Sequence, residues 1–221
     1  MESKKLREIA NTTAETLQSY LQDTENWKTS KKTKEVLVEA KHSAIPGNEH
    51  GHIYRAQCEL SCSKDILHKY MYPVGGALSE IRRKWDKDVS DILLLERIAP
   101  DLTINLVRTN SAAMGVIYPR EFLDLFFELQ TDNCLSFNGV SIDYPSQLPN
   151  PKFVRGWNHP SGFFCQDIPG RPGHTKLVII VQTDIKGNLP RSLVDSAIPG
   201  AVVGLCHNLR NMLKKDGHIP R

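Results

Sequence analysis

The sequence predicts an α+β fold, in which helices at the two ends of the chain flank a long run of strands. Apolar residues recur with a helical period near each end. Between them, short strand-like runs follow one another closely, with no helical stretch long enough for a parallel crossover. We therefore expect an antiparallel sheet covered by two long helices, in a single domain spanning residues 1–221.

The first element is an amphipathic helix from Lys4 to Leu21. Its apolar positions form a one-sided stripe with a period of about 3.6 residues: Leu6, Ile9, Ala10, Thr13, Leu17, Tyr20 and Leu21. Two strands come next, at Val36–Val38 and Ile53–Cys58, separated by the turn residues Pro46-Gly47-Asn48.

Two short helices, Asp65–Tyr70 and Gly76–Arg83, precede the main run of strands. The predicted strands of that run are Ile92–Ile98, Thr103–Arg108, Phe122–Leu129, Leu135–Ile142, Phe153–Trp157 continuing to Cys165, and Leu177–Thr183.

The last element is a long helix that opens at Leu189-Pro190 and ends near Lys215, where basic residues suit the helix dipole. A sheet of eight or nine twisted strands curls, and its concave face must be covered. The last helix, roughly 38 Å long, is long enough to cover it. Periodicity leaves open whether the space beneath is a packed core or an apolar cavity.

Composition excludes several classes of protein. The 28 Lys and Arg against 25 Asp and Glu give a net charge of +3, too mild to indicate nucleic acid binding. No apolar run reaches the roughly 20 residues of a membrane-spanning helix, and the first residues lack the apolar core of a signal peptide, so we expect a cytoplasmic protein. The five cysteines contain no CxxC pair, and we expect reduced thiols.

The sequence also lacks the common catalytic and cofactor motifs. The eight histidines have no ligand spacing, so we expect no metal site. His159 lies near Ser161, but no GxSxG motif accompanies them, and no glycine-rich phosphate loop is present. We expect no catalytic residues and no cofactor.

Four strings carry a family resemblance. They are Trp85-Asp86, Tyr118-Pro119-Arg120-Glu121-Phe122, Phe153-Val154-Arg155-Gly156-Trp157-Asn158-His159-Pro160 with Gly162-Phe163, and Gln182-Thr183-Asp184-Ile185-Lys186-Gly187-Asn188-Leu189-Pro190-Arg191-Ser192. In this order and spacing the chain, from Trp27 to about Lys215, resembles the START domain, the steroidogenic-acute-regulatory-protein-related lipid transfer family. It looks most like the small stand-alone sterol carriers of that family.

The resemblance implies a helix-grip fold, a curved nine-stranded antiparallel sheet that encloses a lipid tunnel capped by the long C-terminal helix. It also implies a monomeric, non-enzymatic carrier that binds one sterol or steroid-like lipid and transfers it between membranes. A bile-acid or phospholipid carrier of the same fold is the alternative. Two further alternatives are an enzyme on the helix-grip scaffold and an adaptor with a filled core.

Candidate ligand contacts follow from the predicted elements. A guanidinium from Arg82 or Arg108 would meet the lipid head group, unless it faces solvent or pairs with Asp86, Asp88 or Asp124. Phe126 stands where the steroidogenic branch has the Arg of an internal acid–Arg pair, so that pair is not expected. The other predicted contacts are Trp85 and Asn110, with Leu193, Val194, Ala197, Ala201 and Leu205 as the tunnel roof.

Two surface features complete the prediction. The loop between two strands resembles the family's gating loop, and its apolar residues would close the tunnel and contact a bilayer, or else pack under the last helix: Ser111, Ala112, Ala113, Met114, Val116 and Ile117. A basic cluster near the first hairpin would attract anionic membranes transiently, or else protect a sheet edge: Lys28, Lys31, Lys32 and Lys34.

Overall fold

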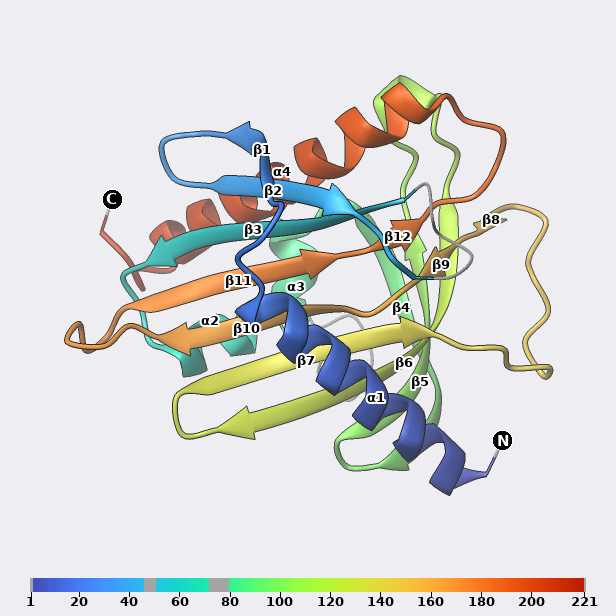
Figure 1. Ribbon diagram of the computed structural model, residues 1–221, viewed down its shortest axis with the longest axis horizontal. Helices are drawn as coiled ribbons and strands as arrows, with labels where there is room; N and C mark the ends of the chain where they lie inside the picture. The colour runs from blue at the N-terminus through green and yellow to red at the C-terminus, as the bar shows by residue number, and fades with distance from the viewer. Residues whose placement is uncertain (1, 46–50, 72–79, 221) are drawn as a thin grey trace.

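A nine-stranded antiparallel sheet organises the molecule, in a computed structural model that describes residues 2–45, 51–71 and 80–220 (Figure 1). Its spatial order is β1-β2-β3-β11-β10-β7-β6-β5-β4, which confirms the predicted sheet. The sheet is open, with β1 and β4 at its edges. The bounds are β1 Lys28–Lys32, β2 Leu37–His42, β3 His52–Leu60, β4 Val89–Ala99, β5 Leu102–Thr109, β6 Arg120–Thr131, β7 Cys134–Ser141, β10 Ser161–Asp167 and β11 Thr175–Val181.

Helices cover both faces of the sheet. The first helix, α1 (Ser3–Gln22), crosses one face, here called the outer face, and α4 (Arg191–Lys215) lies on the other, the inner face (Figure 1). Two short helices, α2 (Lys64–Met71) and α3 (Glu80–Trp85), also pack on the inner side. The predicted turn at Pro46-Gly47-Asn48 and the start of the predicted helix Gly76–Arg83 lie outside the described residues.

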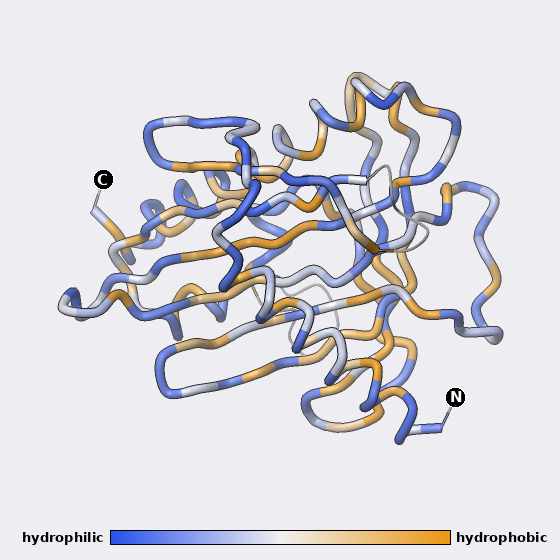
Figure 2. The backbone as a smooth tube through the Cα atoms, viewed as in Figure 1, coloured by the Kyte–Doolittle hydropathy of each residue, from blue (hydrophilic) through white to orange (hydrophobic). Residues whose placement is uncertain are grey.

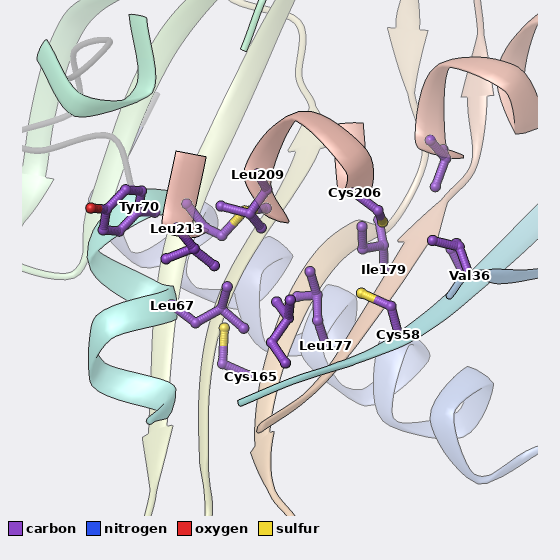
Figure 3. Packing of buried hydrophobic residues seen from close by; sticks show 14 of the residues in the cluster. Val36, Cys58, Leu67, Tyr70, Cys165, Leu177, Ile179, Cys206, Leu209 and Leu213 are labelled. Carbon is purple, nitrogen blue, oxygen red and sulfur yellow. The ribbon is translucent and has the colours of Figure 1, made fainter. Parts of the chain in front are cut away.

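The alternation of side chains along β11 shows why its sequence is apolar from Leu177 to Val181. Leu177 and Ile179 face α2 and α4 in the largest core cluster, with Leu209 of α4 packed above them (Figure 3). Val178 and Ile180 point the other way, toward Leu17 of α1. A strand segment covered on both faces needs no polar positions, and Figure 2 shows β11 as hydrophobic after its first two residues.

The predicted strand from Phe153 to Cys165 is interrupted twice. It is divided into β8 (Val154–Arg155), β9 (Trp157–Asn158) and β10, and β8 pairs in parallel with β6. The first break falls at Gly156, where an added Cβ would lie 2.3 Å from the Phe122 ring. The second falls at Pro160, which has no N–H for a ladder hydrogen bond. The predicted strand Leu177–Thr183 is divided as well. Its main part is β11, which ends at Val181, and Thr183 belongs to β12 (Thr183–Asp184), which pairs with β9.

The terminal helices match their predicted bounds within two residues. The stripe of α1 is buried at Leu6, Ala10, Thr13 and Leu17, as its period predicts. Within the described ranges, no helix combines the length and apolarity needed to span a bilayer.

Candidate functional site

A cavity of about 170 Å³ lies on the inner face of the sheet, where β4 to β7 meet β10 and α3. Its walls are mostly apolar, with Val107 of β5 and three phenylalanines among them. The described polar side chains along the wall come from five elements: Arg82, Asp124, Asn158, Ser161 and Thr183. The arrangement is a mostly apolar chamber in whose wall Asp124, Asn158 and Thr183 are joined by hydrogen bonds.

Three aromatic rings occupy much of the concave face beside the cavity. The ring centroids of Phe126 and Phe137 are 4.7 Å apart in an edge-to-face arrangement, and Phe163 stacks on Phe137 at 6.5 Å. Gly139 provides space for this packing, since an added Cβ there would lie 2.9 Å from the Phe126 ring. Ligand pockets usually measure about 300–1,000 Å³, so a lipid-sized guest requires these rings to move.

Asp124 is the most unusual polar group in the cavity wall, and the sequence analysis considered it only as a partner for an arginine. It is 2% exposed. Ser141 Oγ donates a hydrogen bond to Asp124 Oδ1 at 2.7 Å, and Asn158 Nδ2 donates to Oδ2 at 2.9 Å. Burial nevertheless raises the pKa of Asp124 to about 6, because desolvation disfavours the charged form. Its position as a lone carboxylate in the apolar run 122–127 is the sequence feature that could have identified it.

Arg82 lines the cavity, but its guanidinium is held by the protein. Its Nε lies 2.9 Å from Asp86 Oδ2, and Nη1 donates to the carbonyl of Met71 at 2.7 Å. Both charged side chains are buried. The pairing with Asp86 that the sequence analysis gave as an alternative is therefore present, and it links α3 to the end of α2.

Arg108, the other predicted head-group ligand, lies outside the cavity. Its Nε is 3.8 Å from Glu121 Oε2, and its guanidinium lies 5.0 Å from the ring of Phe153. Glu121 is fully buried and also accepts a 2.8 Å hydrogen bond from Arg155. Because side chains alternate along β5, Val107 faces the cavity and Arg108 faces the outer side.

Two other predicted ligand contacts have structural roles. Asn110 is exposed, and its Nδ2 donates to the carbonyl of Lys87 at 2.8 Å, which ties the end of β5 to the start of β4. Trp85 is 2% exposed within the core cluster beneath α4 and is not among the described residues of the cavity wall.

The predicted roof residues also do not line this cavity. Ala201 is exposed, and Leu193, Val194, Ala197 and Leu205 are half-buried. The buried stripe of α4 instead runs through Val202, Val203, Cys206, Leu209, Met212 and Leu213. These residues cover the β3–β11–β10 part of the inner face (Figure 3). Each residue turns the helix by about 100°, so an error of one position moves a predicted stripe to its flank.

The predicted gating loop projects its apolar side chains into solvent. Met114 is fully exposed and Val116 is 56% exposed, whereas Ile117 is buried. Ala112 and Ile117 form a backbone bridge that closes the loop around the short turn η2 (Ala113–Gly115). Ala113 and Met114 both have positive φ angles, of 49° and 54°. Packing under the last helix therefore does not explain the exposed residues; Ser111, Ala112 and Ala113 are exposed as well.

The basic cluster lies at one edge of the sheet. Lys28, Lys31 and Lys32 are exposed on β1, and Lys34 is exposed in the turn that follows. Figure 2 shows this strand as mostly hydrophilic. A Cβ added at Gly200 of α4 would lie 3.7 Å from Lys31 Nζ, so the cluster adjoins the helix that covers the inner face.

Neither larger hollows nor metal clusters offer a competing site. Three hollows of about 500 Å³ lie elsewhere on the molecule, one around Tyr20 and Lys41, one around Tyr144 and Leu148, and one between the β1–β2 turn and Arg210 of α4. In the parts of the chain that are described, no three His, Cys, Asp or Glu side chains are grouped as metal ligands would be.

Comparison with known proteins gives one consistent family. The START domain family model matches residues 8–216. StAR-related lipid transfer protein 5 of Bos taurus is 34% identical over 94% of this chain and 95% of its own length. Human StAR-related lipid transfer protein 6 is 32% identical over 93% of this chain and 90% of its own. The solved structure of human StAR-related lipid transfer protein 5 superposes with a TM-score of 0.88 at 30% identity, covering 98% of this chain and 100% of that one. The chain belongs to the START domain family.

Proposed function

We propose that this protein is a non-enzymatic lipid carrier that holds one sterol or steroid-like lipid on the inner face of its sheet and transfers it between membranes. The observation that carries the proposal is the apolar chamber with a hydrogen-bonded polar cluster in its wall. Its relatives are named lipid transfer proteins, which supports the same activity here.

The physical advantage of such a carrier is desolvation. At about 25 cal/mol per Å² of apolar surface, exposing several hundred Å² of a steroid to water costs on the order of 10 kcal/mol. An apolar chamber removes most of that barrier. Orientation needs only one or two polar groups, and the chamber has them at Asp124 and its donors.

Uptake on this proposal is a conformational step. The rings of Phe126 and Phe137 turn aside, and the loop 111–117 moves away from the N-terminal part of α4, where Leu193, Val194 and Ala197 are only half-buried. Lipid contact then stabilises the enlarged chamber, as any ligand favours the state that it binds better.

Two surfaces would contact the membrane. The exposed Met114 and Val116 enter the bilayer interface, while the lysines of β1 attract the anionic cytoplasmic leaflet at about 1 kcal/mol each. The proposal therefore places the protein in the cytoplasm, as a monomer with transient membrane contact.

Native mass spectrometry of the purified protein tests the proposal directly. The protein is offered an extract that contains sterols, bile acids and phospholipids. We expect one steroid-sized lipid per chain. A carboxylated steroid or a phospholipid as the retained species would replace the sterol assignment with the corresponding carrier, and no retained lipid would support an adaptor with a filled interior.

A further inference from the structure

The cavity wall contains a carboxylate on β6 that is held in place by a chain of hydrogen bonds from three other strands. Thr183 Oγ1 of β12 donates to Asn158 Oδ1 of β9 at 2.7 Å, and Asn158 Nδ2 donates to Asp124 of β6. Ser141 of β7 donates to the other carboxylate oxygen, and its own Oγ accepts the Asn158 backbone N–H at 2.7 Å. The orientation of Asp124 is thus fixed by residues that are distant in sequence.

These contacts leave Asp124 able to accept more hydrogen bonds. A carboxylate has about four acceptor positions, and the side chains around it supply two donors. Each oxygen therefore retains a position for another donor. Since Asp124 lines the cavity, that donor can come from a ligand.

A second acceptor lies beside it. Asn105 of β5 is paired in register with Asp124 of β6, so the two side chains share the inner face of neighbouring strands. Asn105 is fully buried and its Nδ2 donates to Thr103 Oγ1 at 2.7 Å, but its Oδ1 has no hydrogen-bond partner among the described residues. A buried acceptor without a donor is energetically costly, so this position also favours a donor.

The charges at the cavity oppose a negatively charged ligand. Arg82 is the cation among the described lining residues, and Asp86 neutralises it at 2.9 Å. Arg155, whose charge also acts on Asp124, is bonded to Glu121. An ionised Asp124 therefore leaves a negative charge at the wall, where the surroundings screen it weakly.

We propose that Asp124 and Asn105 recognise a hydroxyl donor on a neutral lipid, and that Asp124 excludes lipids that would place a carboxylate there. This inference rests on the proposed function, because it specifies the chemistry of the lipid that the chamber holds. It makes Asp124 a specificity-determining residue, with Ser141 and Asn158 as the residues that position it.

The test measures binding of three steroid probes to the full chain. The probes are cholesterol, cholest-5-ene, which lacks only the 3-hydroxyl group, and 5β-cholanic acid, which has a carboxylate and no hydroxyl. We expect the wild-type protein to prefer cholesterol to cholest-5-ene by about tenfold or more and to bind 5β-cholanic acid most weakly. Asp124→Leu should reduce the hydroxyl preference to within about twofold while cholest-5-ene binding persists.

Asp124→Asn supplies a second variant that conserves size and one acceptor oxygen. It should improve 5β-cholanic acid binding by about fivefold or more, whereas Asp143→Asn, which neutralises an exposed carboxylate, should leave all three affinities unchanged. Equal wild-type binding of cholesterol and cholest-5-ene would overturn this inference and leave the carrier function standing. Failure of the wild-type protein to bind any steroid would overturn the carrier function, and this inference with it.

Discussion

Tyr54 of β3 donates a 3.1 Å hydrogen bond from its hydroxyl to Asp195 in the second turn of α4. His52 Nδ1 lies 3.0 Å from the same carboxylate oxygen, and Arg191 is 3.2 Å from this carboxylate. Burial and the Asp195 charge raise the pKa of Tyr54, so its hydroxyl stays a donor at neutral pH. These contacts fasten the N-terminal part of α4 to the sheet.

The first prediction concerns this attachment. Asp195→Ala removes the shared acceptor, so backbone amides of residues 194–198 should exchange with solvent about fivefold faster or more, because one such bond contributes about 1 kcal/mol. The matched control is Asp216→Ala, which removes an equivalent bond from Tyr70 at the opposite end of α4. Hydrogen exchange followed by mass spectrometry should show acceleration at one end of the helix in each variant. Equal exchange at residues 194–198 in the wild-type and Asp195→Ala proteins would contradict the attachment.

The second prediction concerns the basic edge strand. Replacing Lys31 and Lys32 by Glu should slow transfer from anionic vesicles at least tenfold, since the loss of two attractions of about 1 kcal/mol each already weakens membrane binding about 30-fold. The matched control replaces Lys4 and Lys5, two exposed lysines in the first turn of α1, at the far end of the molecule from β1 (Figure 1). Transfer between vesicles of neutral lipids should be unchanged in both variants. Equal slowing by the two charge reversals would show that net charge, rather than β1, sets the rate.

The third prediction concerns the exposed loop. Met114 has no packing to lose, since it is fully exposed, so Met114→Asp should alter the free energy of unfolding by less than about 1 kcal/mol. Asp also tolerates the positive φ angle of 54° at this position. Vesicle transfer should nevertheless slow at least fivefold, because a charge replaces an apolar side chain at the bilayer contact. A large loss of stability, measured by urea unfolding, would indicate that this loop is part of the core.

The sheet was predictable because most of its strands are long and closely spaced. The breaks near Gly156 and Pro160 were missed, and so was the edge strand β1, because its sequence Lys28–Lys32 contains no apolar residue. Both breaks depend on tertiary contacts or on a missing N–H at one residue. The cavity wall was harder to predict. The strand Thr103–Arg108 was placed correctly, but both of its faces carry apolar residues, Ile104 and Leu106 on one and Val107 on the other, so the sequence did not show which face meets the cavity. The same uncertainty hid the pairing of Asn105 with Asp124, which depends on the register between β5 and β6.

The fourth prediction uses the buried carboxylate as a probe of stability. The pKa of Asp124 rises from its ordinary 3.8 to about 6 in the folded protein, with desolvation as the main cause. Between about pH 4 and 6 the folded protein therefore binds more protons than the unfolded chain, and this residue lowers stability as pH rises through that window. Above pH 6 its full contribution is a loss of about 3 kcal/mol, which Asp124→Asn removes.

Urea unfolding at pH 4 and pH 7 measures this effect as the difference between the wild-type and Asp124→Asn proteins. The free energy of unfolding of the Asn variant relative to the wild type should rise by about 2–3 kcal/mol between pH 4 and pH 7, because the variant has no charge to bury at this position. Ser141→Ala should have the opposite effect on the pH dependence of stability. The hydrogen bond that Ser141 donates lowers the pKa of Asp124, so its removal should raise that pKa further and steepen the loss of stability with pH. A difference between wild type and Asp124→Asn that stays constant from pH 4 to pH 7 would mean that Asp124 titrates as an ordinary exposed carboxylate, in conflict with its place in the cavity wall.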